Sequence, residues 1–334
     1  MYNVITEVDK SYSGYINGNY CVRISSRNNR TWETLKYGEK VFKPDFPDSI
    51  DLKLTNRCKV GCPYCHEGSF PGGKIFNLDR TIKVLSKLPR VPIELAIGGG
   101  DILCNDSMES VTNFIKWAVD YGFEVNGTIN IKSFPRDGSL TPGMLRIMSL
   151  LDNVGISIEN CNLFKEREDE ILDTSDPVKV AISGVPWRNK VFHVILGIFS
   201  VSDLRDVLKG LYSWDCDKLL ILGYKSFGRG KNMNPLNKEL IEEYREVIKD
   251  YLHHEKERTT TIGFDNLALE QLDLKSIVQK NHWEKFYLGE EFTNSMYIDA
   301  VEETFAPTSR STDRMKWKDI SLLDYFQKYH TEWL

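Results

Sequence analysis

The sequence predicts an α/β fold, in which a mainly parallel β-sheet covered by helices forms an open or partial barrel of six or more units. Two observations support this prediction. From residue 50 onward, short apolar runs alternate with longer amphipathic segments. Polar and glycine-rich stretches then follow several of the apolar runs, at the carboxyl ends of strands where such sheets bind their ligands.

The first 49 residues differ from the rest, because they are rich in Tyr, Asn, Ser and Arg. Residues 13–24 (SGYINGNYCVRI) predict two short strands around an Asn-Gly turn, since this dipeptide favours tight hairpins. We expect residues 1–49 to form a small β-rich cap, followed by the barrel over 50–265. Residues 266–334 are expected to be a C-terminal extension that closes the barrel, and both flanking pieces are expected to contact the substrate.

The barrel strands are predicted at the apolar runs. They are 50–55, 93–97, 123–129, 154–158, 190–198, 218–224 and 260–265. The helices are predicted at the amphipathic segments between them, which are 77–88, 107–122, 141–151, 200–212 and 237–254. Local signals support the helix ends: Asn77 or Asp79 can cap the first, Gly122 stops the second, and Pro142 suits the first turn of the third. A further strand (295–301) and a terminal helix (321–329) complete the chain.

Bulk composition excludes several classes of protein. The 334 residues are 41% hydrophobic, which suits a globular protein with a large core. The net charge is −5 with acids and bases interspersed, which argues against a nucleic-acid partner. The N-terminus lacks the pattern of a signal peptide, and the longest apolar run (191–201) is too short to span a bilayer. Seven cysteines, an odd number with three clustered, favour a cytoplasmic location.

Three cysteines, Cys58, Cys62 and Cys65, form a C-x3-C-x2-C motif directly after the first predicted barrel strand. A structural zinc site normally takes four protein ligands, and His66 adjoins Cys65 too closely to complete one easily. A redox dithiol uses two cysteines and leaves Cys58 without a role. A cubane iron–sulfur cluster normally has one cysteine on each of four irons, so three cysteines leave one iron open. The motif alone leaves these alternatives open, including a non-catalytic zinc-stabilised binding protein.

With Tyr64 just before its last cysteine, this motif on a β/α barrel resembles the radical S-adenosylmethionine (SAM) superfamily. The resemblance covers roughly residues 50–265 and implies a partial (β/α)6 TIM-like barrel. It implies that the three cysteines hold one [4Fe–4S] cluster and that SAM binds the open iron. It also implies reductive cleavage of SAM to a 5′-deoxyadenosyl radical, which abstracts hydrogen from a substrate. The implied redox partner is a one-electron donor such as flavodoxin or ferredoxin.

The resemblance extends to the residues after the second barrel strand. Gly98, Gly99 and Gly100 match the place of a Gly-Gly-Glu-type motif that meets the SAM amino group. Asp101 stands where the acid of that motif would be, but one residue later and one methylene shorter. Taken alone, the same stretch is a glycine-rich turn between a strand and a helix.

Later strand ends supply the other SAM contacts that the resemblance implies. Ser157 or Glu159 is expected to reach the SAM ribose or carboxylate. Leu222 and Tyr224 are expected to flank the adenine. Lys225 and Arg229 are expected to pair with the SAM carboxylate or with an anionic substrate, although a solvated basic loop is the alternative.

Three further features bear on the reaction. His193 is interpreted either as a core histidine or as a barrel-facing residue near the substrate. Cys161 is interpreted either as a small buried side chain or as a thiol that returns a hydrogen atom to a substrate radical. Residues 296–311 resemble the hairpin frame of a domain that holds auxiliary clusters, but without its cysteines. Because Cys216 is the last cysteine of the sequence, this region has no ligands for a further cluster, and one cluster is predicted. The substrate stays unidentified, with a peptide, protein or small molecule favoured over RNA.

Overall fold

The largest element of the protein is a ten-stranded sheet. The computed structural model describes residues 4–5, 12–25, 30–37, 41–104, 107–135, 139–160, 190–210, 218–233, 235–253, 261–280, 283, 287 and 292–332. The strands of the sheet are β5 (Ser49–Thr55), β6 (Glu94–Gly99), β7 (Glu124–Asn130), β8 (Asn153–Ser157), β9 (Lys190–Ile195), β10 (Lys218–Leu222), β11 (Thr261–Phe264), β12 (Ser295–Asp299), β13 (Thr304–Ala306) and β14 (Met315–Lys316).

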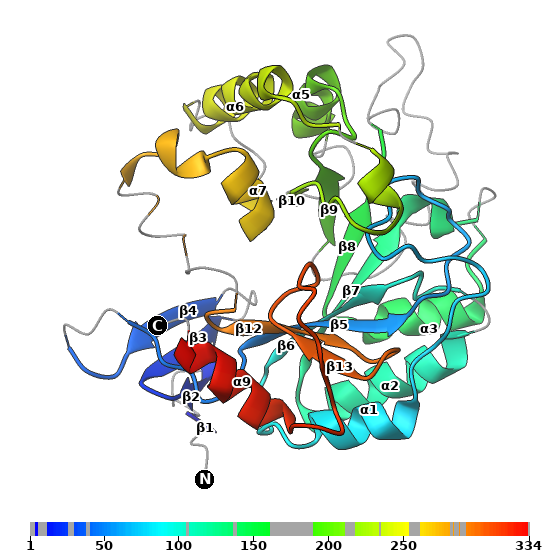
Figure 1. Ribbon diagram of the computed structural model, residues 1–334, viewed down its shortest axis with the longest axis vertical. Coiled ribbons are helices and arrows are strands. Elements are labelled where there is room, and N and C mark those ends of the chain that lie inside the picture. Colours follow the sequence, from blue (N-terminus) through cyan, green and yellow to red (C-terminus); the bar gives the residue numbers. More distant parts are fainter. Residues whose placement is uncertain are drawn as a thin grey trace.

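Their spatial order is β11-β10-β9-β8-β7-β6-β5-β12-β13-β14. Figure 1 shows the run from β10 through β9 and β8 to β7. Every neighbouring pair from β11 to β12 is parallel, whereas β13 and β14 add on in antiparallel orientation. Parallel neighbours that follow one another in sequence require a crossover after each strand, and a helix supplies it in each connection that the structure describes between β5 and β8 and between β9 and β11. The predicted α/β partial barrel is therefore confirmed.

Helices connect and cover these strands. They are α1 (Leu78–Leu85), α2 (Met108–Tyr121), α3 (Pro142–Leu150), α5 (Val201–Gly210), α6 (Lys238–His253), α7 (Asn266–Gln271) and α9 (Leu322–Glu332). The local signals act as predicted: the Asn77 side chain accepts a hydrogen bond from the Arg80 amide, and Gly122 ends α2 with a φ of 109°. Strand β9 ends three residues earlier than predicted, because Gly197 turns the chain at a φ of 78°.

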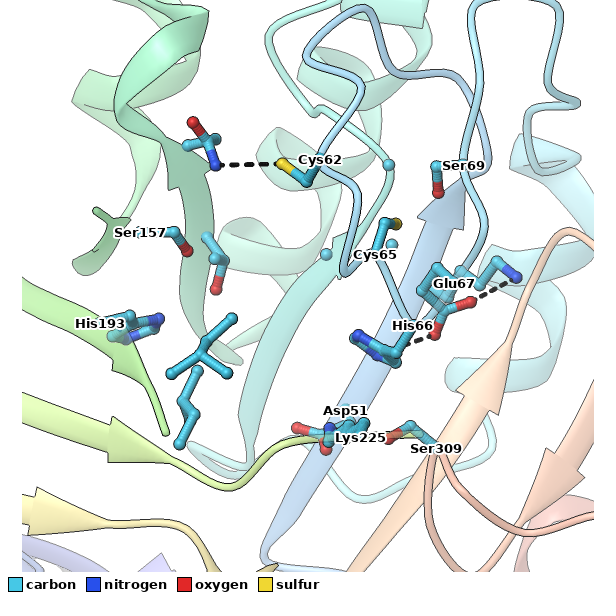
Figure 2. A pocket seen from close by; sticks show the side chains of 18 of the residues that line it. Asp51, Cys62, Cys65, His66, Glu67, Ser69, Ser157, His193, Lys225 and Ser309 are labelled. Carbon is cyan, nitrogen blue, oxygen red and sulfur yellow. Dashed lines mark hydrogen bonds and ion pairs between the residues drawn. The ribbon is translucent and has the colours of Figure 1, made fainter. Parts of the chain in front are cut away.

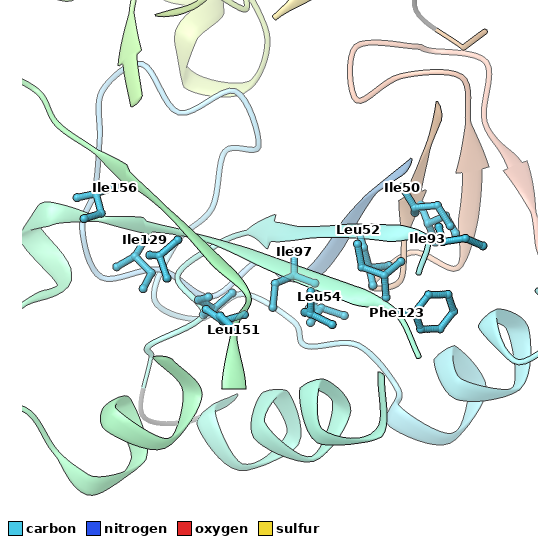
Figure 3. Close-up of a cluster of buried hydrophobic side chains, with 14 of the residues drawn as sticks. Ile50, Leu52, Leu54, Ile93, Ile97, Phe123, Ile129, Leu151 and Ile156 are labelled. Atoms are coloured by element: carbon cyan, nitrogen blue, oxygen red, sulfur yellow. The ribbon is translucent and has the colours of Figure 1, made fainter. Parts of the chain in front are cut away.

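The main core lies between the strands and the helices α1, α2 and α3, which cover one face of β5, β6 and β7 (Figures 1 and 3). Successive side chains of β7 point alternately to the two faces of the sheet. Val125 and Ile129 are buried on the helix side, whereas Asn126, Thr128 and Asn130 face the interior of the barrel. Burial of each such large aliphatic side chain stabilises the fold by about 1.5–3 kcal/mol.

A separate four-stranded antiparallel sheet precedes the barrel. Its strands, in spatial order, are β1 (Val4–Ile5), β2 (Tyr12–Asn17), β3 (Tyr20–Ser25) and β4 (Arg30–Thr34). The predicted hairpin is β2–β3, but its two-residue turn is Gly18–Asn19, one position later than predicted. Gly18 adopts a φ of 57° and lies against the Lys43 carbonyl, where a side chain would not fit.

This N-terminal sheet docks at the amino ends of the barrel strands. Asp48, just before β5, accepts hydrogen bonds from Tyr15 (3.0 Å), Tyr20 (2.6 Å) and two further side chains, those of Asn17 and Trp32. Arg30 forms a 2.5 Å ion pair with Glu124, the first residue of β7. The loop that carries Cys58, Cys62 and Cys65, called the cysteine loop below, follows the opposite end of β5. None of the described residues of the cap lines the cavity described below, and the expected substrate contacts from the cap stay a prediction.

The C-terminal part extends the sheet beyond β5. Strand β12 pairs in parallel with β5, and β12 to β14 form the predicted hairpin region with one strand more than expected. Helix α9 packs Tyr325 and Phe326 against Phe292. The division at residues 49 and 265 stays a prediction. Among the helices described, none is both long and apolar enough to cross a membrane.

Candidate active site

A cavity of about 430 Å³ opens at the carboxyl ends of the barrel strands (Figure 2). Nearly all the residues predicted from the sequence line it, and they come from the carboxyl ends of four different strands or from the loops that follow them. They are Cys58, Cys62, Tyr64, Cys65, Gly98, Gly99, Gly100, Asp101, Ser157, Leu222, Tyr224 and Lys225. Glu159 does not line the cavity but contacts one of the cysteines. Parallel topology, rather than sequence proximity, therefore assembles this site.

The three cysteines lie on one loop between β5 and α1. The Cys58 amide donates to the Phe70 carbonyl (3.1 Å), and the Cys65 amide donates to the Cys62 carbonyl (3.2 Å), so the loop folds back on itself. Cys58 is buried, whereas Cys62 and Cys65 are partly exposed, and all three are free thiols. Within the part of the chain that the structure describes, no three His, Cys, Asp or Glu side chains are close enough to share one metal ion.

Cys62 is surrounded by polar groups from β7 and β8. Its thiol lies 3.3 Å from a carboxylate oxygen of Glu159 and 3.6 Å from the Asn130 amide nitrogen, and Lys132 pairs with Glu159. Burial, followed by the hydrogen bond to Glu159, raises the pKa of Cys62 to about 12. Burial also raises the pKa of Cys58. These thiols therefore keep their protons at neutral pH unless a cation displaces them, as metal binding to cysteine requires.

The three glycines at the end of β6 serve different purposes. A Cβ on Gly98 would meet no atom within 4 Å, so the missing side chain leaves open space in the cavity. A Cβ on Gly99 would lie 2.5 Å from the Thr55 carbonyl oxygen, and its φ is 104°. Gly100 lies equally close to the Arg57 backbone, and its amide donates to the Thr55 carbonyl at 2.6 Å. Gly99 and Gly100 thus let β6 approach the cysteine loop.

Asp101 borders the cavity but already has a structural contact. One carboxylate oxygen accepts from the Leu103 amide at 2.9 Å, which fixes the turn after β6. Burial raises the pKa of Asp101, although the hydrogen bond from the Leu103 amide opposes this effect. The expected contact of Asp101 with the SAM amino group stays a prediction.

His193 on β9 faces the barrel interior, so of the two sequence-based interpretations the structure supports the barrel-facing one. Its ring lies against Gly155, where a Cβ would be 2.5 Å from Nε2, and it borders the cavity on the side opposite Cys62 and Cys65 (Figure 2). Its Nδ1 is buried without a hydrogen-bond partner among the described residues. Burial lowers the pKa of His193 to about 4, so the ring is neutral at pH 7. Cys161 lies outside the described residues.

Two basic residues of the loop after β10, Lys225 and Arg229, make different contacts. Lys225 lines the cavity, where its ammonium group donates to the Ser309 hydroxyl at 3.0 Å. Arg229 does not line the cavity; it donates to the carbonyls of Cys62 (2.9 Å) and Ser69 (2.7 Å). The expected pairing of Arg229 with the SAM carboxylate stays a prediction, although its Nε and Nη1 already donate to backbone carbonyls of the cysteine loop.

Sequence reasoning missed the charged wall of the cavity next to β12. It contains Lys53, Glu67, Tyr297 and Ser309, and Lys53 also pairs with Asp299 of β12 at 3.1 Å. One signal was available, since a lysine inside the apolar strand IDLKLT implies a buried partner. One partner of Lys53, Glu67, lies in the nearby cysteine loop, but the other, Asp299, comes from a segment more than 200 residues away, which no local pattern indicates.

Comparisons with known proteins agree with this architecture. No family model matches the sequence. GTP 3′,8-cyclase from Clostridium perfringens (strain SM101 / Type A) is 23% identical over a match of 237 residues, and the match covers 64% of this chain. The chain spans 66% of the length of that cyclase.

Two groups of solved structures share the fold. SuiB from Streptococcus suis superimposes with a TM-score of 0.62 at 10% identity, covering 96% of this chain and 88% of SuiB. The enzyme anSMEcpe with bound AdoMet, which is SAM, gives a TM-score of 0.56 at 12% identity, covering 86% of this chain and 83% of the other.

These three proteins are radical SAM enzymes. The likeness to the solved structures establishes the partial barrel, and the similarity to the cyclase establishes relatedness in sequence. Together with C-x3-C-x2-C after the first barrel strand, these findings support the resemblance of the chain to the radical SAM superfamily.

Proposed function

We propose that the protein is a radical SAM enzyme in which Cys58, Cys62 and Cys65 hold one [4Fe–4S] cluster. The main support is that three thiols of one short loop border a single cavity at the carboxyl end of the barrel. The donor set fits the group, because three thiolates serve three irons and leave the fourth for SAM. When bound, the cluster would supply the electron that cleaves SAM to methionine and a 5′-deoxyadenosyl radical. Flavodoxin or ferredoxin is the proposed source of that electron.

The SAM contacts are proposed at strand ends around the same cavity. The open space at Gly98 admits the ligand, and Asp101 lies nearby for its amino group. The Lys225 ammonium has one hydroxyl partner among the described residues and can pair with a carboxylate. The other proposed contacts are Tyr64, Gly99, Gly100, Ser157, Glu159, Leu222 and Tyr224.

The substrate proposed is a peptide, a protein side chain or a small molecule. Two structures that share the fold support a peptide: SuiB bound to precursor peptide SuiA (TM-score 0.59) and anSMEcpe with a bound Kp18Cys peptide (TM-score 0.56). The wall at His193 offers a neutral hydrogen-bonding ring across the cavity from the cysteines.

Anaerobic reconstitution with iron and sulfide tests this proposal. The wild type is expected to take up about four irons per chain and to show thiolate-to-iron absorption. Cys58→Ala, Cys62→Ala and Cys65→Ala should each lose most of this uptake. Cys21→Ala is the matched control, since Cys21 is also buried but lies on β3, away from the cavity. A wild type that retains one zinc and takes up no cluster would instead favour the zinc-stabilised binding protein.

A further inference from the structure

Arg229 contacts the backbone of the cysteine loop through three hydrogen bonds. It belongs to the short helix η4 (Gly228–Asn232), which follows β10. Its Nε donates to the Cys62 carbonyl at 2.9 Å and its Nη1 donates to the Ser69 carbonyl at 2.7 Å. Its backbone amide donates to the Cys65 carbonyl at 3.0 Å. One residue therefore holds both ends and the middle of the segment 62–69.

The backbone around Arg229 is shaped for this contact. Gly228 adopts a φ of 54°, and a Cβ at this position would lie 2.6 Å from the Cys65 carbonyl oxygen. A Cβ on Gly230 would lie 3.1 Å from the Tyr64 carbonyl oxygen. Glycine at both positions lets the two loops touch along their backbones. The contact is thus part of the fold and does not depend on a single flexible side chain.

The charge of Arg229 has no acidic partner in the described part of the chain. Its hydrogen bonds go to carbonyl oxygens, and its Nη2 is buried without a partner. Other buried cations here are paired: Lys53 with Glu67 and Asp299, and Arg30 with Glu124. Arg229 as a whole is partly buried, but its Nη2 is withdrawn from solvent. A charge that is withdrawn from water without a counter-ion is destabilising, so an anion is expected close to Arg229. An iron–sulfur cluster held by three thiolates is such an anion.

We propose that Arg229 is a positioning residue that holds the cysteine loop ready for the cluster and raises the reduction potential of the cluster through its unpaired charge. This inference rests on the proposed function, because it assumes that the cysteines bind a cluster. A nearby positive charge stabilises the reduced, more negative form of a cluster, and net charge and hydrogen bonds are known determinants of cluster potential. The electron donor then needs less driving force to start the reaction.

Three variants separate position from charge. Arg229→Gln removes the charge, whereas Arg229→Lys keeps it but loses the two-point grip. Lys231→Gln is the matched control, because Lys231 is an exposed cation of the same short helix. Two measurements apply: the reaction rate of the cysteine-loop thiols with a thiol reagent in the metal-free protein, and the midpoint potential of the reconstituted cluster by redox titration monitored by electron paramagnetic resonance.

In the metal-free protein, both Arg229 variants should react about tenfold faster than the wild type or more, since charge-assisted hydrogen bonds to the loop are lost. In the reconstituted protein, Arg229→Gln should have a more negative midpoint potential, and Arg229→Lys should stay close to the wild type. Lys231→Gln should match the wild type in both measurements. Equal thiol rates in all proteins would overturn the positioning role, and equal potentials would overturn the role of the charge.

The outcome also distinguishes this inference from the proposed function. A wild type that takes up no cluster overturns both. A wild type that takes up the cluster, together with an Arg229→Gln variant of unchanged thiol reactivity and potential, overturns this inference alone. Because Arg229→Lys keeps the positive charge, it is the variant used for the thiol measurement if Arg229→Gln does not fold.

Discussion

Lys53 and Glu67 form a buried ion pair, with 2.7 Å between Nζ and Oε2, that joins the first barrel strand to the cysteine loop. Asp299 of β12 pairs with the same ammonium group at 3.1 Å, and the Tyr297 hydroxyl donates to Glu67 at 3.0 Å. Burial alone would raise the pKa of Glu67, but His66 and Lys53 hold it well below its usual range. The C-terminal segment is thereby connected, through one charged network, to the residues just after Cys65.

The first prediction concerns this network. Lys53→Met should lower the unfolding free energy of the metal-free protein by about 3–5 kcal/mol, because it leaves Glu67 and Asp299 buried without their shared cation. The side chains of Lys53, Glu67 and Asp299 are 7%, 9% and 3% exposed. Urea unfolding followed by circular dichroism measures the change.

The control for this prediction is an exposed pair. Lys74 and Glu302 lie 3.3 Å apart with side chains 75% and 46% exposed. Lys74→Met should therefore change the unfolding free energy by less than about 1 kcal/mol. Similar losses for Lys53→Met and Lys74→Met would show that the buried network does not stabilise the cysteine loop.

The second prediction separates two neighbouring glycines. Gly98→Ala should leave the unfolding free energy nearly unchanged, because its Cβ meets open space, but should weaken SAM binding to the reconstituted protein. Gly99→Ala should lower the unfolding free energy by about 2 kcal/mol or more, since it combines a positive φ with a clash against the Thr55 carbonyl. Urea unfolding and anaerobic calorimetry with SAM distinguish the two effects. Equal stability of both variants would contradict the described geometry.

The third prediction follows from the buried imidazole of His193. Its folded-state pKa is about 4, below the ordinary value of 6.5. Between these values the unfolded chain binds a proton that the folded chain does not, so stability is present above pH 6.5 and falls as the pH drops. From pH 7 to pH 5 this residue should cost the wild type about 2 kcal/mol.

His193→Gln provides the reference for that prediction, because glutamine does not titrate. Urea unfolding of both metal-free proteins at pH 7 and pH 5 gives two free-energy differences. The advantage of the wild type over the variant should shrink by about 2 kcal/mol at the lower pH. A constant advantage would mean that the ring is already solvated or protonated in the folded protein.

Local pattern in the sequence was sufficient for the barrel. Strands such as 154–158 and helices such as 107–122 carry their own periodicity and end signals, and the structure reproduces them within a few residues. The cysteine loop and the glycines at 98–100 could be placed together because parallel strands bring their carboxyl ends to one edge.

Contacts between distant segments were beyond the reach of local pattern. An arginine in a glycine-rich loop after a strand suggests an anion site, yet packing brings the carbonyls of Cys62 and Ser69 to Arg229. Asp299 meets Lys53 across 246 positions of sequence. The N-terminal sheet contacts the amino ends of the barrel strands partly through the ion pair between Arg30 and Glu124. No periodicity in the sequence indicates that pair.

The most direct test of the central claim is the search for 5′-deoxyadenosine. The reconstituted protein is incubated anaerobically with SAM and a strong reductant, and the products are separated by liquid chromatography with mass detection. We expect 5′-deoxyadenosine from the wild type and from Cys21→Ala, and none from Cys58→Ala, Cys62→Ala or Cys65→Ala. A wild type that binds the cluster but releases no 5′-deoxyadenosine would contradict the proposal that this cavity is a radical SAM active site.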